Sequence, residues 1–574
     1  MKNILNKLNT KMSFNILTII VLIIVTIFMF FWINQKEGFH EDEVFSYGSS
    51  NYKWDNLFQA ADKSDYLNRT IEKYIIGENL GDTISNIFYY MNHQDEWGEL
   101  SNEIHSKDKP EWKTPEDAKE YVVVEGDDVF NYLSVYYNQS RDVHPPLFYM
   151  LVHLVSSIFY GTFSKYIIFF INIIFFLLTC NIIRKIFILF DKKWLGLITI
   201  LLYGLSMGAA STVIFLRMYS MLTFFCITYL YLNLKILHNN LEITKKDKWK
   251  LWGTILLGFL TQYYFCIFVI LVFILMSIKM IIKKEYKTFR KYLILHIVSA
   301  ITGIIIFPAS IYHIFFSYRG AGGQAGSMSI FNAIGFYLIR LSEAFSINNI
   351  FSLLTIVLVI LGGAIILIKK VVKKEKIINY YQYLLIVIPT IIYFILISKM
   401  APDTDAKYAI RYIMPILPEI AIIFVILAFN IFRNIKIKYL IVVGSFFIIT
   451  INGMITNEPK YLYKGYNKYI ELANEYKDLD YVYAVDNAFT YLTSIPEFMI
   501  YNKSIIINMN YDKLDFLRED EELQKQNKYI LSIKKWMNVE DTLNKILEST
   551  GFNEYEVLLD NEDDTQSIIY LVSR

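Results

Sequence analysis

The sequence predicts an α-helical membrane protein with about eleven transmembrane helices, followed by a small α/β domain outside the membrane. Of its 574 residues, 55% are hydrophobic and only 19% are charged, and the mean hydropathy is +0.35. Soluble domains carry about 45–50% apolar and about 25% charged residues. The apolar excess comes in runs of about 20 residues, the length that crosses a bilayer as a helix. After residue 455, short apolar runs alternate with polar stretches.

Each predicted span is an apolar run bounded by polar residues. The spans are 13–34, 165–189, 194–214, 218–237, 249–262, 264–282, 291–316, 350–370, 379–398, 411–431 and 438–455. The first run has no small-residue cleavage site, so it is predicted to stay as an anchor. Residues 249–282 are too long for one span and have basic flanks, so they are divided at an outer turn. Residues 146–162 are too short and are predicted to form a helix at the outer membrane surface.

The topology follows from the distribution of lysine and arginine. The N-terminal tail and five connections between spans are basic, whereas 35–145 holds 10 basic and 23 acidic residues and 456–574 holds 13 and 22. The sequence therefore predicts a multi-pass cell-membrane protein with its N-terminus in the cytoplasm and its C-terminus outside. The predicted parts are the tail with the first span (1–34), an outer loop with surface helices (35–164), a transmembrane module (165–455) and an outer α/β domain (456–574).

Within the outer parts, several local elements are predicted from short patterns. Residues 65–76 fit an amphipathic helix, 121–124 a strand, and the glycine-rich stretch 319–326 a mobile loop. In the tail, 481–485, 503–507, 555–559 and 567–572 are predicted strands and 539–549 a helix, which together suggest an α/β fold.

Composition also excludes some functions. The net charge of +2 excludes a nucleic-acid binder driven by bulk charge. All three cysteines, Cys180, Cys226 and Cys266, lie inside apolar runs, so neither a disulfide framework nor a cysteine zinc site is available. The abundant Tyr, Ile, Lys and Asn are typical of a low-GC bacterium.

The first candidate site is an acidic run just beyond the first span, Glu41-Asp42-Glu43. Three adjacent carboxylates at the mouth of a span repel one another, which predicts a raised pKa for at least one of them. Such a carboxylate could act as a general base on an acceptor hydroxyl or bind a metal. An acidic, solvated loop start is the alternative interpretation.

The second candidate is Arg141-Asp142-Val143-His144-Pro145-Pro146, where the prolines fix the entry into the predicted surface helix. Asp142 and His144 would then face the membrane surface. Taken alone, this stretch is better explained as a plain helix start with a polar cap.

Three basic residues in two segments are candidates for binding phosphate. Arg217, followed by Tyr219, is the basic residue of a short outer turn, and a guanidinium fork matches phosphate oxygens. Lys407 and Arg411, followed by Tyr412, share one helix face and could complete a phosphate cradle. Snorkelling of the arginine to ordinary lipid headgroups is the alternative for Arg217.

Two weaker signals complete the candidates. Gln262 and Tyr263 lie at the predicted outer turn within 249–282, where aromatic residues usually anchor the protein at the interface. The pair Asp403 and Asp405 is compatible with a divalent cation, but two carboxylates are a weak metal signal, and no metal ligand is assigned.

The order of these motifs resembles a known family. Asp42-Glu43 follows the first span, Asp-Val-His-Pro-Pro-Leu-Phe-Tyr at 142–149 ends the long outer loop, Arg217-Met218-Tyr219 lies at the next outer turn, and Arg411-Tyr412-Ile413-Met414-Pro415 opens a late span. This pattern is similar to the GT-C glycosyltransferases of the glycosyltransferase family 39 kind, which include protein O-mannosyltransferases and aminoarabinose transferases. The similarity covers about residues 13–455.

The resemblance implies an integral membrane enzyme that moves a sugar from a polyprenyl-phosphate donor to a glycan, lipid or protein acceptor of the cell envelope. Asp42 matches the catalytic acid and Glu43 its neighbour, His144 belongs to a motif bordering the active site, and Arg217 and Arg411 stand where basic residues meet the donor phosphate. Glu41 departs from the pattern, so the choice of base among three carboxylates stays open. Direct displacement at the anomeric carbon with inversion is the expected mechanism.

Two other functions fit parts of the pattern. A transporter or flippase also needs many spans and a few charges near the membrane, but the sequence shows no inverted repeat. A polymerase or ligase that uses a lipid-linked oligosaccharide is closer, and the sequence hardly distinguishes it from a transferase of single sugars.

Overall fold

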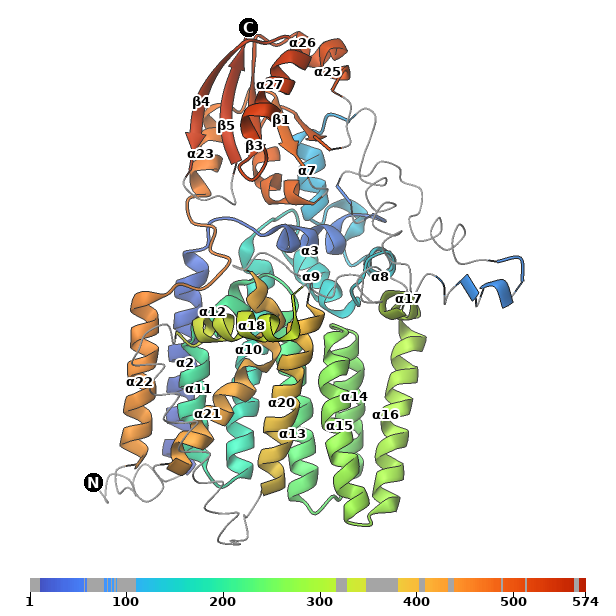
Figure 1. Ribbon diagram of the computed structural model, residues 1–574, viewed down its shortest axis with the longest axis vertical. Coiled ribbons are helices and arrows are strands. Elements are labelled where there is room, and N and C mark those ends of the chain that lie inside the picture. The colour runs from blue at the N-terminus through green and yellow to red at the C-terminus, as the bar shows by residue number, and fades with distance from the viewer. Residues whose placement is uncertain are drawn as a thin grey trace.

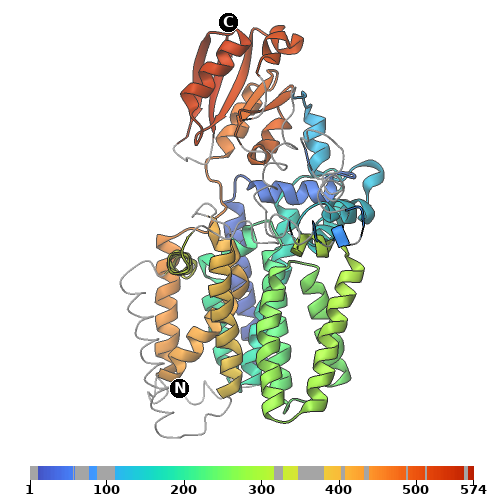
Figure 2. The same ribbon diagram turned by 45° about the vertical axis from the view of Figure 1, so that its right-hand side comes forward.

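A computed structural model describes residues 11–55, 57–58, 77–79, 81–83, 85–86, 89, 110–315, 328–346, 380–401, 408–431, 438–486, 489–510, 514–561 and 567–574. A bundle of upright helices carries a layer of shorter helices at one end, and a small sheet domain lies beyond that layer (Figures 1 and 2). The predicted helix 65–76, the glycine-rich residues 319–326, the span 350–370 and the polar residues 402–407 lie outside the described residues.

Six described helices are long and apolar enough to cross a membrane. They are α2 (Lys11–Asn34), α10 (Lys165–Leu189), α13 (Tyr219–His238), α15 (Tyr264–Ile282), α16 (Tyr286–Ile306) and α20 (Tyr380–Met400). Counting the bent pair α11 (Lys193–Gly204) and α12 (Met207–Ile214), which turns by 65°, as one span gives seven. The protein is therefore a multi-pass, α-helical membrane protein, as its composition predicts.

Three further helices stand upright in the same bundle: α14 (Lys245–Phe259), α21 (Leu417–Ile431) and α22 (Lys438–Thr456) (Figure 1). The span predicted at 411–431 starts later than expected, since 409–416 form two 3-10 turns, η3 (Ala409–Tyr412) and η4 (Met414–Ile416). Pro418 is the second residue of α21, in the first turn where proline is tolerated, and Leu417 before it has helical backbone (φ −59°, ψ −39°). The late start leaves Arg411 on a tight turn.

The layer at the end of the bundle is built from short helices. They are α3 (Glu41–Asn51), α7 (Pro115–Val122), η2 (Gly126–Asp128), α8 (Tyr132–Ser140), α9 (Leu147–Ile158), α17 (Ala309–Phe315) and α18 (Ile330–Ala344). Helix α9 fits the predicted surface helix, and its twelve residues are too few to cross a bilayer. The strand predicted at 121–124 is wrong, because Thr114 and Asp117 form a capping box that starts α7 and carries the helix to Val122.

The sheet domain has five strands in the order β2-β1-β3-β5-β4. The strands are β1 (Tyr481–Val485), β2 (Ser504–Asn508), β3 (Lys528–Lys534), β4 (Glu554–Asp560) and β5 (Ser567–Ser573). Strand β1 is parallel to β2 and β3, whereas β5 runs antiparallel to β3 and β4. The four predicted strands and the α/β class are confirmed, and the central strand β3 was not predicted.

Short helices surround this sheet: α23 (Asn467–Glu475), η5 (Thr490–Ser494), α24 (Ile495–Phe498), α25 (Phe516–Glu519), α26 (Glu521–Gln524) and α27 (Val539–Thr550). The sheet domain also contacts the outer layer at positions away from the chain that enters the domain. Lys113 pairs with Ser504 of β2 as an isolated antiparallel bridge, and the Trp112 indole donates to Asp520 at 3.2 Å. These contacts hold the sheet domain against the segment that precedes α7.

Candidate active site

The site is built around the start of helix α3, which follows α2 after a short turn. His40 is the N-cap, and its Nδ1 accepts a hydrogen bond from the Asp42 backbone N–H at 3.0 Å. Helix α3 packs closely on α7, since a Cβ at Gly48 would lie only 2.1 Å from the Tyr121 ring. The Asn51 amide also donates to the Val122 carbonyl at 2.7 Å. These contacts fix α3, and with it the carboxylate of Asp42.

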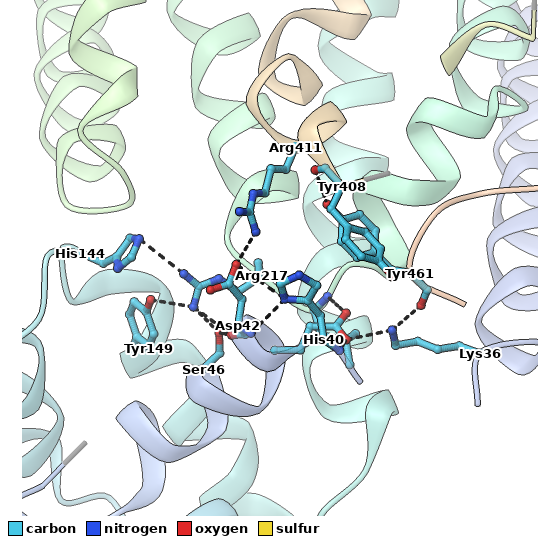
Figure 3. A network of polar contacts seen from close by, with 12 residues as sticks. Lys36, His40, Asp42, Ser46, His144, Tyr149, Arg217, Tyr408, Arg411 and Tyr461 are labelled. Carbon is cyan, nitrogen blue, oxygen red and sulfur yellow. Dashed lines mark hydrogen bonds and ion pairs between the residues drawn. The ribbon is translucent and has the colours of Figure 1, made fainter. Parts of the chain in front are cut away.

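Two arginines from distant parts of the chain meet Asp42 (Figure 3). Arg411 Nη1 lies 2.5 Å from Asp42 Oδ2, although the two residues are 369 positions apart. Arg217 Nη1 donates to the Asp42 backbone carbonyl at 3.1 Å. The Asp42 side chain keeps 25% exposure, whereas Arg217 is only 2% exposed. The Asp42 carboxylate is therefore more accessible to solvent than the Arg217 guanidinium.

Arg217 is held by neutral acceptors. Its Nη1 also donates to the Ser46 hydroxyl at 2.7 Å and the Tyr149 hydroxyl at 3.1 Å. Neither residue was a predicted site residue. Ser46 lies one helical turn after Asp42, and Tyr149 ends the motif at 142–149, so both carried a spacing signal. These hydrogen bonds fix the orientation of the Arg217 guanidinium, and none of the acceptors named here is a carboxylate.

His144 joins this network through both ring nitrogens. Its Nδ1 lies 2.7 Å from Asp142 Oδ2, and its Nε2 lies 3.4 Å from Arg217 Nη2. An arginine nitrogen can only donate, so Nε2 must accept and Nδ1 must carry the proton that is shared with Asp142. This arrangement fixes one tautomer of His144, and the ring orients Arg217.

Glu43 has different surroundings from Asp42, although the two are adjacent. Its carboxylate is fully buried and lies 2.9 Å from the Lys36 ammonium. It also accepts from the backbone N–H groups of His40 at 2.7 Å and Leu216 at 2.8 Å. Burial raises the pKa of Glu43, and the Lys36 charge acts against that rise. The predicted rise in pKa in this acidic run thus occurs, but its cause is desolvation rather than repulsion between neighbours.

The Lys36–Glu43 pair ties the site to the chain that enters the sheet domain. Lys36 Nζ donates to the Tyr461 carbonyl at 2.6 Å, and the Tyr461 hydroxyl donates to the Tyr408 carbonyl at 2.9 Å. The Tyr461 ring stacks on Phe215 with 3.9 Å between centroids. One residue therefore contacts the segments that carry Asp42, Arg217 and Arg411. These contacts join residues too far apart in sequence for any local pattern to predict.

His40 lies edge-on to four aromatic rings: Phe215, Tyr408, Tyr461 and Tyr463. Burial lowers the pKa of His40 to about 3, and the nearby positive charges of Arg411, Lys36 and Arg217 act in the same direction. The imidazole is therefore neutral at physiological pH and serves as a helix cap inside an aromatic box.

Of the other predicted site residues, two adjoin the network. The Tyr219 ring stacks on Phe215 with 5.6 Å between centroids, and the Arg411 guanidinium lies 5.2 Å from the Tyr412 ring centroid. Three others make the following contacts. Arg141 Nη1 donates to the Tyr137 hydroxyl, the Tyr263 hydroxyl lies 2.9 Å from His313 Nδ1, and Gln262 accepts from the backbone of its neighbour. Lys407 lies outside the described residues.

Within the described residues, no group of three or more His, Cys, Asp and Glu side chains is placed to hold a metal ion. The predicted acidic pair Asp403 and Asp405 is not among those residues. At Asp42, the guanidinium groups of Arg217 and Arg411 supply positive charge. Such groups bind phosphate oxygens through paired N–H donors.

Comparisons with known proteins give structural neighbours at low identity. No protein-family model matches the chain, and no curated protein matches it. The chain is similar to ArnT from Cupriavidus metallidurans bound to undecaprenyl phosphate, with 12% identity and a TM-score of 0.46, over 74% of this chain and 87% of that one.

It is also similar to the archaeal oligosaccharyltransferase AglB from Archaeoglobus fulgidus in complex with an inhibitory peptide and a dolichol-phosphate. That comparison gives 11% identity and a TM-score of 0.37, over 69% of this chain and 62% of the other. At this level of similarity, the residues of the site rather than the overall fold decide the functional assignment.

Proposed function

We propose that this protein is a membrane glycosyltransferase of the GT-C kind, which transfers a sugar from a polyprenyl-phosphate donor to an acceptor outside the cell. The observation that carries the proposal is the partly exposed Asp42, whose carboxylate pairs with the Arg411 guanidinium and whose backbone carbonyl accepts from Arg217. A base next to two fixed cations suits a reaction in which a hydroxyl attacks while a phosphate departs.

The reaction is a single displacement with inversion. Asp42 takes the proton of the acceptor hydroxyl as its oxygen forms a bond to the anomeric carbon. The bond between that carbon and the phosphate oxygen breaks, and its electron pair leaves with the polyprenyl phosphate. The leaving group needs no protonation, because cations at Arg217 and Arg411 stabilise its charge. Arg411 exchanges part of its contact with Asp42 for the donor phosphate when the donor binds.

The other residues of the site act by positioning Asp42, Arg217 or Arg411. His144, with its tautomer fixed by Asp142, holds Arg217 in place. Glu43 is assigned a positioning role rather than that of base, because its carboxylate is buried against Lys36 and binds the Leu216 N–H next to Arg217. Positioning by such contacts matters because small displacements of catalytic groups cost large factors in rate.

The proposed orientation puts the site on the outer side of the membrane. The layer that holds α3 lies at the end of the bundle next to the sheet domain (Figure 1). The acidic excess of 35–145 and 456–574 assigns that end to the outside, and the basic N-terminus to the cytoplasm. A site at the bundle end suits a lipid-linked donor, whose headgroup lies at the surface. A transporter site would lie near the midplane.

A transfer assay tests this function. The purified protein in liposomes would be supplied with a panel of radiolabelled polyprenyl-phosphate sugars and with cell-envelope material as acceptor. We expect transfer of one sugar from one donor, with inverted anomeric configuration in the product. Transfer of whole oligosaccharides instead would identify a polymerase or ligase, and donor movement across the bilayer without transfer would identify a flippase.

A further inference from the structure

A carboxyl group that the proposed reaction does not use is buried inside the helix bundle. Glu419 belongs to the first turn of α21, and it is 0% exposed. Neither of its carboxyl oxygens has a hydrogen-bond partner among the residues that the structure describes. Glu43, the buried acid beside the site, instead has an ammonium and two backbone N–H groups as partners. An ionised carboxylate without such partners is very costly in an apolar interior.

The surroundings of Glu419 are uncharged at neutral pH. Helix α21 packs against α11, α13 and α20 in the bundle (Figure 1). Tyr203 on α11, Cys226 on α13 and Tyr393 on α20 lie close enough to interact electrostatically with Glu419. The other elements that contact α21, namely η4, α10 and α22, contribute no described titratable group that acts on this carboxyl. The start of α21 supplies only a partial positive charge of about half a unit.

Two ligands can neutralise a buried carboxylate: a metal cation or a proton. Hard cations require several carboxylate, carbonyl or water oxygens. The groups that interact with Glu419 are two phenols and a thiol, and the described part of the chain offers no metal-binding group of His, Cys, Asp and Glu. A proton requires only the carboxyl itself. These surroundings therefore favour a neutral carboxylic acid.

The carboxyl lies in the segment that also carries Arg411. Turns η3 and η4 and the start of α21 follow one another within 409–419. Helix α13 supports this segment, because the Thr223 hydroxyl donates to the Met414 carbonyl of η4 at 3.4 Å. A negative charge on Glu419 would draw water into this junction, since a charge buried without partners is otherwise unstable.

We propose that Glu419 is a proton-binding site in the core of the bundle, that the site is occupied at neutral pH, and that its proton maintains the junction of α11, α13, α20 and α21. The proposal goes beyond glycosyl transfer and does not depend on it. The unfolded chain loses this proton in the ordinary range for glutamate, at about pH 4–5. The folded protein keeps it at neutral pH, so the contribution of Glu419 to stability falls as the pH rises.

Thermal unfolding in detergent tests this site. Glu419→Gln replaces the acid with a neutral group of the same shape, so it should raise Tm at neutral pH. The difference from wild type should grow by about 1–3 °C per pH unit between about pH 5 and about pH 8. Glu343→Gln is the matched control, because Glu343 uses its charge with Arg340 at 2.8 Å and Lys460 at 3.3 Å. This control should not raise Tm, and its Tm should follow the wild-type dependence on pH.

Infrared spectroscopy gives a second measurement that does not depend on stability. At neutral pH, subtracting the Glu419→Gln spectrum from that of wild type should leave the carbonyl stretch of a protonated carboxylic acid. The same subtraction with Glu343→Gln should leave carboxylate bands. Glu419→Met supplies the subtraction if the amide variant does not fold.

Three results would overturn the proposal. One is a carboxylate signal from Glu419 at neutral pH, and another is a Tm difference between Glu419→Gln and wild type that stays constant with pH. The third is a wild-type Tm that rises in NaCl or KCl relative to choline chloride while Glu419→Gln shows no such rise, which would identify a metal cation as the ligand. These measurements use neither donor nor acceptor, so their failure is separate from a failure of the proposed function.

Discussion

Asp42 and Arg411 form an ion pair at 2.5 Å across 369 residues of sequence. The pair joins the helix that follows the first span to a tight turn before α21, and Arg217 completes the arrangement from a third segment. Because Asp42 remains partly exposed while both guanidinium groups are largely buried, substrate can reach the acid without displacing the whole network. Substitutions of single residues separate the role of each group in the proposed reaction.

Arg411→Ala should lower kcat about 100- to 1000-fold, the usual cost of losing one group that stabilises developing charge. The reason is that the departing phosphate loses a cation. Transfer kinetics in liposomes would measure the change. Arg184→Ala is the matched control, because Arg184 lies near the other end of α10 and donates to Asn181, and it should retain most activity. Similar losses in both variants would show a general effect on folding rather than a role for Arg411.

His144→Ala should reduce kcat/KM about tenfold, because Arg217 Nη2 loses its acceptor and becomes less well oriented. Asp142→Asn should have a smaller effect than Asp142→Ala, since an amide oxygen can still accept from His144 Nδ1. Steady-state kinetics of the three variants would establish the ranking. Equal activity of Asp142→Asn and Asp142→Ala would contradict the assigned tautomer.

Glu43→Gln and Lys36→Met should each destabilise the protein by about 3–5 kcal/mol, because each leaves a buried charge without its partner. The double variant Lys36→Met/Glu43→Gln should recover much of that stability, since neither charge remains. Thermal unfolding in detergent would measure the three variants. Lys53→Met, which breaks an exposed pair with Asp127, should leave the Tm close to that of the wild type. Strictly additive losses in the double variant would be inconsistent with a coupled pair.

Stability should fall as pH drops below the ordinary histidine value of 6.5, because the pKa of His40 is lowered to about 3 by burial. The unfolded chain binds a proton at this residue between these two pH values, whereas the folded protein does not. The contribution is full above pH 6.5 and declines by at most about 1.4 kcal/mol per pH unit on acidification. His40→Asn keeps a capping side chain without this titration, so its Tm should depend less steeply on pH. Parallel Tm profiles for wild type and His40→Asn would refute this assignment.

The parts of the fold that depend on local pattern were predictable from sequence. Apolar length predicted the spans at 165–189 and 264–282 at the bounds of α10 and α15, and a short apolar run predicted β1. The strand expected at 121–124 failed because the capping box at Thr114 outweighed a β-branched run. Strand β3 was missed although Tyr529–Ile533 is mostly apolar, since charged residues close to both ends obscure the run.

The sequence predicts which residues form the candidate site, but not which contacts each of them makes. The order of the motifs predicted that Asp42, Arg217 and Arg411 would meet, and they do. Nothing in the local sequence distinguishes Asp42 from Glu43, because the difference comes from their partners: Glu43 lies against Lys36 and the Leu216 N–H, whereas Asp42 pairs with Arg411. Tyr461 was equally unpredictable, since its contacts reach three distant segments.

The most direct test of the central claim is the transfer rate of Asp42→Asn in liposomes with labelled polyprenyl-phosphate sugar. Removing the base should lower kcat about 100- to 10,000-fold while the donor still binds, because Arg217 and Arg411 remain. Asp127→Asn, at an exposed position, should transfer sugar at the wild-type rate. Wild-type transfer by Asp42→Asn would contradict the account.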